Sequence, residues 1–579
     1  MNSAIRNILV TAIALSAEGL ISHAQPAPTA KKPPMVSTTI DFLDYAFFRH
    51  KGPENYYTLE EYEAELKELA DAGIRKIYLR VNVCGLTHYP SKVAAQYGEN
   101  GALHWTFEEQ ALRLVETYKH YNPCTETIRI GHKYGMEVWA WESLHDDAGV
   151  CYSSSDIPER YADIYRKLDG WALLDPFYLD NPDALAEIDP KFQMDEQEVQ
   201  RINEKARRLP IEKIVFTNPS DKWKHLPLGK ITQDNIRIYT SSDNRKYVLY
   251  DKSFEFKAQK IDGRNQIVLS GLNIAEPYIK LDCTDNSSNH SMVINSPTGQ
   301  GELINTAGEA VPSTWNWGKG APDKTWLNFK HFGGSAAWDY QDRNVGCFVG
   351  VIPPARYYYG VAEYATTKGM AHMVDRFNEL AEYPFDGFMF NTRCHSFRSD
   401  AERYGFNPEV LSKFKARHGH DYAGSKEDLD GICKIRAEGI ADFFKNCKAI
   451  ANGRPIYMSA PLPIEKRNDA NFNTSFGPLP WLYKRYFADG SIDGVMMIGK
   501  NWNNGDDFSS YFTEDVTGGK PIKIGIFREG AKYARDKSFF FKDMGELLKS
   551  NLDEIEFYES MILNQQHDML NFIRTTNKH

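Results

Sequence analysis

The sequence predicts an α/β fold: a (β/α)8 TIM-type barrel with a small antiparallel β-sandwich inserted into it. Three observations support this. An amphipathic helix, a glycine or polar break and a short apolar strand follow one another repeatedly, and eight such strands can be placed. The strands are apolar runs, as burial on both faces requires. No glycine-rich phosphate loop follows the first strand, which argues against a doubly wound open sheet.

The eight strands are predicted in chain order from the apolar runs. The first is expected at Thr39–Phe48, and Gly73 and Gly135 stand just past the first two predicted helices, where a glycine is the expected stop. The other seven strands are predicted at Arg75–Asn82, Met136–Glu142, Phe385–Asn391, Pro455–Ala460, Ile492–Ile498, Pro521–Glu529 and Glu554–Glu559. Alternation of helix and strand implies that the sheet is parallel.

A long interval separates the third strand from the fourth. Its first part is irregular, with a charged helix near Asp195–Arg208, and six short β-type runs follow from Ile211 to Asp282. The predicted domains are therefore residues 36–210 (barrel strands one to three and a long loop), 211–330 (the inserted β-sandwich) and 331–579 (strands four to eight). The insert leaves from the face where barrel active sites form, so it either overhangs the site or acts as a spacer or dimer module.

The N-terminus has the pattern of a signal peptide over residues 1–24. Arg6 supplies a positive charge, Ile8–Leu15 is apolar, and Ser22-His23-Ala24 ends the segment with small residues around the histidine. We therefore expect an exported protein, periplasmic or extracellular. No other segment approaches the ~20 apolar residues of a membrane span, so none is expected after signal removal.

Composition and missing motifs exclude several other classes. A net charge of −10 over 579 residues argues against a nucleic-acid partner. The eight cysteines form no CxxC pair and no HExxH is present, so we expect no metal and no cofactor. The absence of a GxSxG motif argues against an α/β-hydrolase esterase. The sequence leaves the oligomeric state open.

Residues at the C-terminal ends of barrel strands face the mouth and are the first candidates for chemistry. Three glutamates fall there, Glu142, Glu529 and Glu559. Glycosidic cleavage uses a proton donor and a second carboxylate as nucleophile or base, so these three are the candidate catalytic residues. A strand-end ion pair is the alternative for each, for example between Glu529 and the neighbouring Arg528.

Nine more side chains at the strand ends are candidate substrate-binding residues. Arginines bind acidic sugar groups or shift carboxyl pKa values, and flat aromatic rings suit the apolar face of a sugar. The nine are Arg80, Trp141, His145, Asn391, Arg393, His395, Trp502, Arg528 and Tyr558. Asp41, Asp44 and Asp146 are expected to support the site or cap loops. Asp386 and Asp493 are expected to be structural at the barrel bottom.

Four strand motifs, Gly73–Tyr78, Gly135–Trp141, Phe385–Phe388 and Ile492–Val495, resemble those of glycosyl-hydrolase-like barrels distantly related to the family-ten xylanases. Asp175–Asp183 resembles their segment after strand three. The resemblance covers most of the barrel and not the sandwich. It implies carbohydrate as the substrate class, and Glu529 matches the position of the strand-seven nucleophile in retaining barrel glycosidases.

The strand-four position departs from that pattern. Asn391 is followed by Thr392, where the acid/base glutamate of those enzymes stands. We therefore predict an exported glycoside hydrolase for a poly- or oligosaccharide, with Glu529 as nucleophile or base and Glu142 as proton donor, or Glu559 in its place. Two alternatives stay open: a non-catalytic carbohydrate-binding barrel, and a polysaccharide lyase that uses His395, Arg393 and Tyr558.

Overall fold

The computed structural model describes most of the chain. The described residues are 33–42, 56–83, 85–97, 108–150, 172–193, 209–217, 232–234, 236–241, 248–276, 278–283, 301–311, 314–317, 329–332, 337–340, 347–350, 357–392, 403–461, 480–498, 508–529, 536–558 and 560–576. The predicted signal peptide and the predicted charged helix near residues 195–208 lie outside them.

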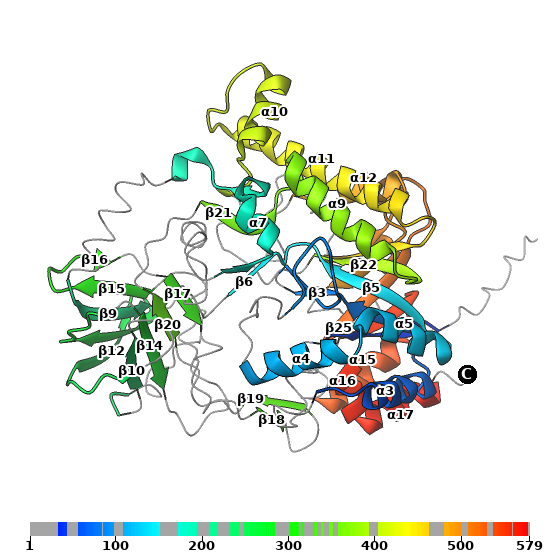
Figure 1. Cartoon of the computed structure of the whole chain (residues 1–579), viewed down its shortest axis with the longest axis horizontal. Coiled ribbons are helices and arrows are strands. Elements are labelled where there is room, and N and C mark those ends of the chain that lie inside the picture. Colours follow the sequence, from blue (N-terminus) through cyan, green and yellow to red (C-terminus); the bar gives the residue numbers. More distant parts are fainter. Residues whose placement is uncertain are drawn as a thin grey trace, which may run out of the picture.

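Eight parallel strands close into a barrel, which confirms the predicted fold class (Figure 1). In order around the barrel they are β1 (Met35–Ile40), β2 (Lys76–Arg80), β5 (Glu137–Ser143), β22 (Gly387–Asn391), β23 (Ile456–Pro461), β24 (Gly494–Ile498), β25 (Lys523–Glu529) and β26 (Glu554–Tyr558). Each strand pairs with the next one in this order, and β26 pairs with β1. β5 and β22 also pair directly, although the insert separates them in the chain.

The first strand lies before its predicted position at Thr39–Phe48. It spans Met35–Ile40, and the prediction was wrong because this strand is not an apolar run. Its hydroxyl side chains are buried and bond to residues of β26; Thr38 Oγ1 donates to the carbonyl of Phe557 at 2.9 Å. The shift makes Asp41 the first residue after β1.

Helices cover the outer face of the barrel. They are α3 (Leu59–Asp71), α4 (Glu108–His120), α5 (Pro123–Lys133), α9 (Thr367–Ala381), α11 (Lys426–Ile450), α12 (Tyr483–Ala488), α13 (Glu514–Thr517), α15 (Lys537–Leu547), α16 (Ser560–Gln565) and α17 (His567–Thr576). A further helix, α10 (Pro408–His418), packs on α11 in a smaller cluster of its own. α3 begins with a capping box, in which Thr58 and Glu61 each bond the other's backbone N–H. The main core fills the space between these helices and the outward-facing strand residues, such as Val138 and Ile526.

The inward-facing residues form layers of four from alternate strands. The strand registers accumulate a stagger of eight residues around the barrel, the value typical of this fold. From bottom to top the layers are Lys76–Gly387–Gly494–Glu554, Ser37–Trp139–Tyr457–Gly525, Tyr78–Met389–Met496–Glu556, Thr39–Trp141–Ser459–Phe527 and Arg80–Asn391–Ile498–Tyr558. We call the last of these the mouth layer.

Glycines in the lower layers make room for large rings. A Cβ on Gly387 would lie 2.6 Å from the Trp139 ring, and one on Gly494 would lie 2.5 Å from the Tyr457 ring. Aspartates beside these glycines bond the neighbouring strands: Asp386 accepts from the Val138 N–H and Asp493 from the Ile456 N–H, each at 2.7 Å. These contacts agree with the structural role predicted for the two aspartates.

The insert is a sandwich of two five-stranded sheets. One holds β9 (Ile211–Thr217), β12 (Glu255–Ile261), β13 (Arg264–Ser270), β15 (Gly301–Asn305) and β16 (Ala310–Val311); the other holds β10 (Ile236–Ser241), β11 (Val248–Leu249), β14 (Tyr278–Cys283), β17 (Thr314–Trp317) and β20 (Cys347–Gly350). Residues of both sheets, including Phe216 and Ile279, share one core. Because β20 pairs with β14, the sandwich runs past its predicted end at residue 330 to Gly350.

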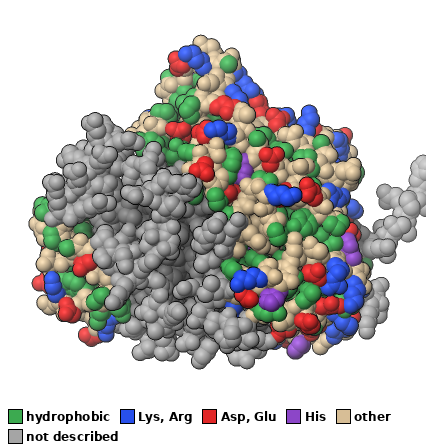
Figure 2. Space-filling view, in the orientation of Figure 1, with side chains coloured by type: hydrophobic (Ala, Val, Ile, Leu, Met, Phe, Trp, Pro, Cys, Tyr) green, Lys and Arg blue, Asp and Glu red, His purple; other side chains and the backbone are tan. Residues whose placement is uncertain are grey.

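The described surface of the barrel side carries acidic and basic side chains interspersed with one another (Figure 2). Over the described ranges, no helix combines the length and the apolar character that crossing a bilayer requires.

Candidate active site

The candidate site is the mouth layer with the loop residues above it. The layer takes one residue from each of four strands, Arg80, Asn391, Ile498 and Tyr558. All four stand at or next to the last residue of their strand, which is the end where barrel active sites form. Sequence-predicted candidates supply three of the four.

Arg80 is a buried clamp between two carboxylates. Its Nη1 lies 2.7 Å from Asp41 Oδ2, and its Nη2 lies 2.8 Å from Asp146 Oδ2. Tyr558 donates its hydroxyl to the same oxygen of Asp41 at 3.3 Å. This joins the ends of β1, β2 and β26 to the loop after β5. The planar guanidinium suits such a bridge because its donors have a fixed fork geometry.

Trp141 lies one layer below the mouth and forms part of its floor. Its ring meets Tyr558 edge-on at 5.4 Å between centroids, and the Arg80 guanidinium carbon lies 5.5 Å from its centroid. Phe527 also packs against Tyr558, at 5.5 Å between centroids. The floor thus holds two aromatic rings beside the hydroxyls of Thr39 and Ser459, while the layer above it is polar apart from Ile498.

The opposite side of the mouth is a hydroxyl and amide cluster. Ser459 donates its hydroxyl to Asn391 Oδ1 at 2.9 Å and accepts from the Thr392 N–H at 2.8 Å. Thr392 in turn donates to the carbonyl of Ser459 at 2.9 Å. Thr392 therefore ties β22 to β23, at the position where the resemblance would place an acid/base glutamate.

Glu529 is the last residue of β25, and its backbone pairs with Tyr558 of the mouth layer. That pairing places the backbone of Glu529 at the rim of the barrel, beside the Tyr558–Asp41–Arg80 group. Four other predicted site residues, Glu559, Arg393, His395 and Trp502, lie outside the described residues.

Glu142 lies on the opposite face of β5 from Trp141. Along β5, Trp139 and Trp141 face the barrel interior, whereas Val138 and Ala140 belong to the core under the helices. Glu142 follows this alternation, and its Oε1 lies 3.3 Å from Arg376 Nη2 on α9. Burial raises its pKa to about 7, although Arg376 opposes the shift. The structure does not bring this glutamate together with the mouth layer.

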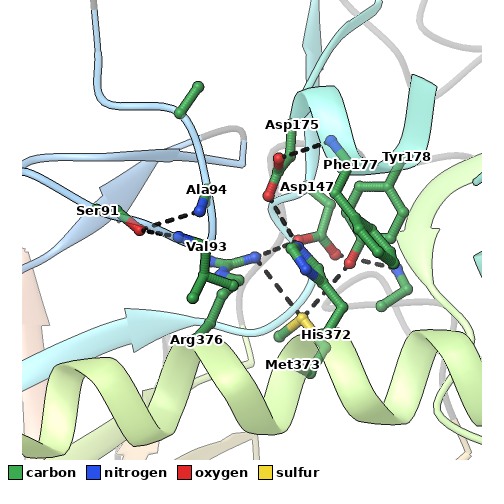
Figure 3. A network of polar contacts seen from close by, with 12 residues as sticks. Ser91, Val93, Ala94, Asp147, Asp175, Phe177, Tyr178, His372, Met373 and Arg376 are labelled. Carbon is green, nitrogen blue, oxygen red and sulfur yellow. Dashed lines mark hydrogen bonds and ion pairs between the residues drawn. The ribbon is translucent and has the colours of Figure 1, made fainter. Parts of the chain in front are cut away.

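Arg376 and His372 carry a second polar network on this helix side (Figure 3). Arg376 Nη1 bonds Asp147 Oδ1 at 2.8 Å, and Asp147 Oδ2 accepts from the Ala362 N–H at 3.0 Å. His372 lies 2.9 Å from Asp175, the residue that caps α7 (Pro176–Asp180). The network holds the loop after β5 against α7 and α9.

Arg528 and His145 also lie on the helix side. Arg528 Nε pairs with Asp543 of α15 at 2.9 Å. The His145 ring packs against Trp481 at 5.2 Å between centroids, and Trp481 in turn stacks on Phe444 of α11. Burial lowers the pKa of His145 to about 3, so its ring is neutral at physiological pH. The geometry gives both side chains packing partners away from the mouth layer.

The sequence reading missed a carboxyl group inside the barrel, Glu556. It is fully buried and bonded to the Thr39 hydroxyl, and burial raises its pKa to about 8. Below it, Glu554 forms a buried ion pair with Lys76 at 2.7 Å. Every second residue of the last strand is polar: Glu554, Glu556 and Tyr558. This alternation places the three side chains on one face of the strand, and the buried glutamates could have been predicted from it.

The site combines a clamped arginine, two aspartates, a tyrosine hydroxyl, an amide cluster and an aromatic floor. Such a set can bind a neutral polyhydroxyl ring, with hydrogen bonds at its rim and apolar contact at its face. Across the described ranges, no group of three or more histidine, cysteine, aspartate or glutamate side chains is arranged to hold a metal ion.

Comparison with known proteins gives little beyond this geometry. No protein-family model matches the sequence, and no curated protein matches it. Among solved structures, the chain is similar to the catalytic domain of a beta-amylase from Paenibacillus polymyxa, with a TM-score of 0.38 and 7% identity over 95% of this chain and 100% of that one. It is similar to Amy13B of Eubacterium rectale, with a TM-score of 0.33 and 9% identity over 93% of this chain and 68% of that one.

A beta-galactosidase from Marinomonas ef1 gives a TM-score of 0.32 and 8% identity over 94% of this chain and 59% of that chain. Likenesses this weak carry no argument about the site, and the barrel assignment comes from the strand pairing itself. The relation to the family-ten xylanases stays a prediction.

Proposed function

We propose that the chain is an exported glycoside hydrolase that binds a poly- or oligosaccharide over the mouth layer. One observation carries the proposal: a closed parallel barrel presents, at its C-terminal end, the partly exposed Tyr558 bonded to the buried Asp41–Arg80 pair, above the aromatic rings of Trp141 and Phe527. Sugar recognition needs both parts, because a sugar ring has hydroxyls around its edge and C–H groups on its faces.

The proposed reaction uses Glu529 as nucleophile or base. The glycosidic C–O bond breaks, the leaving oxygen takes a proton from a carboxylic acid, and water supplies the hydroxyl that ends on the anomeric carbon. The remaining water proton restores the acid. This balance needs two carboxyl groups on one cleft.

We assign proton donation to Glu559, which directly follows β26 and Tyr558. Glu142 lies on the helix side of β5 with Arg376, and Asp41 already bonds both Arg80 and Tyr558. The proposal therefore keeps Asp41 as a positioning residue. It gives the role of proton donor to Glu559, the alternative in the sequence analysis, and not to Glu142.

The test is a screen of the purified chain against a broad panel of polysaccharides and oligosaccharides. New reducing ends without ultraviolet-absorbing unsaturated products would support hydrolysis. Unsaturated products would contradict it and favour the lyase alternative; binding without any product would favour a non-catalytic barrel. Export is tested separately, by sequencing the N-terminus of secreted protein, which should start at Gln25.

A further inference from the structure

Two tryptophans of the same strand differ in how their indole N–H groups are satisfied. Trp139 and Trp141 both face the barrel interior from β5. Trp139 Nε1–H donates to Glu137 Oε2 at 2.9 Å. Trp141 Nε1–H is buried, and within the described part of the chain it finds no acceptor.

This unsatisfied donor is unusual because a buried tryptophan N–H normally finds a partner. Trp141 is only 3% exposed, so bulk water does not supply one. The hydroxyls of its own layer are engaged elsewhere: Thr39 bonds Glu556, and Ser459 bonds Asn391 and Thr392. The donor stands unused directly beneath the polar mouth layer.

We infer that the indole N–H of Trp141 is a ligand-binding donor, which bonds an oxygen of the sugar that sits deepest in the mouth. The inference rests on the proposed function and adds a specificity-determining residue to it. An uncharged oxygen acceptor, either a hydroxyl or the ring oxygen, fits best because Arg80, the cation beside the ring, is already paired with Asp41 and Asp146. A ligand without an acceptor at this point would leave the N–H unpaired and bind more weakly.

The direct test observes the indole N–H itself. Protein labelled with ¹⁵N at the tryptophan indoles is titrated with maltose, cellobiose, lactose, xylobiose and digalacturonate. Loss of a signal in Trp141→Phe and in Trp139→Phe assigns the two resonances. We expect a sugar that binds to shift the Trp141 signal strongly and to leave the Trp139 signal, already bonded to Glu137, nearly in place.

Affinity gives the second readout. Replacing Trp141 with benzothienylalanine keeps the bicyclic ring and puts sulfur where the N–H was, so it avoids the cavity that Trp141→Phe creates. We expect affinity for the sugar to fall about tenfold, as the loss of one buried hydrogen bond predicts. An unshifted Trp141 signal with a bound sugar, or an unchanged affinity, would overturn the inference.

These outcomes separate the inference from the proposed function. A sugar that is cleaved but neither shifts the Trp141 signal nor binds the sulfur analogue more weakly defeats the inference and leaves hydrolysis standing. A sugar that shifts the Trp141 signal but is never cleaved supports the role of the indole N–H in binding and defeats the proposed hydrolysis. No binding by any of the five sugars, with no cleavage in the wider screen, contradicts both.

Discussion

Asp146 and Asp147 are neighbours in the chain, yet they bind arginines on opposite sides of strand β5. Asp146 lies 2.8 Å from Arg80 inside the barrel mouth, and Asp147 lies 2.8 Å from Arg376 on helix α9. All four side chains are buried. The pair therefore fastens the loop after β5 to the barrel mouth through Arg80 and to the helix layer through Arg376.

The first prediction compares the two arginines. Arg80→Lys and Arg376→Lys should each lower the free energy of unfolding, by on the order of 2 kcal/mol, because a lysine cannot hold two carboxylates in a fork. Only Arg80→Lys should also raise KM for the sugar, since Arg376 faces the helices. Urea unfolding and steady-state kinetics measure the two effects. Equal KM changes in both variants would contradict this assignment.

The second prediction concerns the packing of the barrel interior. Gly494→Ala should destabilise the protein by about 1–3 kcal/mol, because the added Cβ would lie 2.5 Å from the Tyr457 ring. Gly545→Ala is the matched control. This glycine lies in α15, and an added Cβ would meet no atom within 4 Å, so alanine should stabilise the protein by about 0.5–1 kcal/mol. Thermal unfolding of both variants checks the sign of each change.

The third prediction uses the raised pKa of Glu142. Its pKa is about 7 in the folded protein because of burial, against an ordinary value of 4.5. The folded state thus holds this proton more tightly, and the associated stability is present at low pH and lost as the pH rises from about 4.5 to about 7. Glu142→Gln removes that loss. The free energy of unfolding of the variant, relative to that of the wild type, should therefore rise over this window by up to about 3 kcal/mol.

Unfolding curves at several pH values test this, with Glu427→Gln on the exposed face of α11 as control. The control should not show the gain expected of Glu142→Gln. A constant difference between Glu142→Gln and the wild type would mean that Glu142 is ionised throughout this window and simply pairs with Arg376.

The fourth prediction concerns Glu556, whose pKa burial raises to about 8. The stability linked to its proton is lost as the pH rises from about 4.5 to about 8, a wider window than that of Glu142. Between pH 7 and 8 the wild type should therefore still lose stability, and Glu556→Gln should not. If the two proteins lose stability in parallel over that interval, Glu556 does not keep its proton in the folded state.

The sequence predicted the barrel well because parallel strands buried on both faces are apolar runs, and glycine marks the helix ends. It misplaced the first strand, which is not an apolar run: the buried hydroxyls of Thr38 and Thr39 bond to β26, which is adjacent in the barrel but far away in the sequence. It also ended the sandwich too early, because the pairing of β20 with β14 joins segments far apart in the chain.

The candidate site was predicted less completely, for a reason of geometry. Successive residues of a strand point to opposite faces, so a strand-end position does not say which face a side chain takes. Trp141 and Arg80 face the barrel interior, whereas Glu142 and Arg528 pair with α9 and α15. The period-two alternation within each strand would have separated the two groups.

The most direct test of the central claim is the rate of reducing-end release by the wild type and by Glu529→Gln, on whichever polysaccharide of the panel is cleaved. Glu514→Gln on the exposed surface of α13 serves as the control. The account predicts that Glu529→Gln loses at least a thousandfold in kcat, on the order of 4 kcal/mol of transition-state stabilisation, with sugar binding retained. Wild-type rates in Glu529→Gln would contradict a hydrolase that works through the carboxylate at the end of the seventh barrel strand.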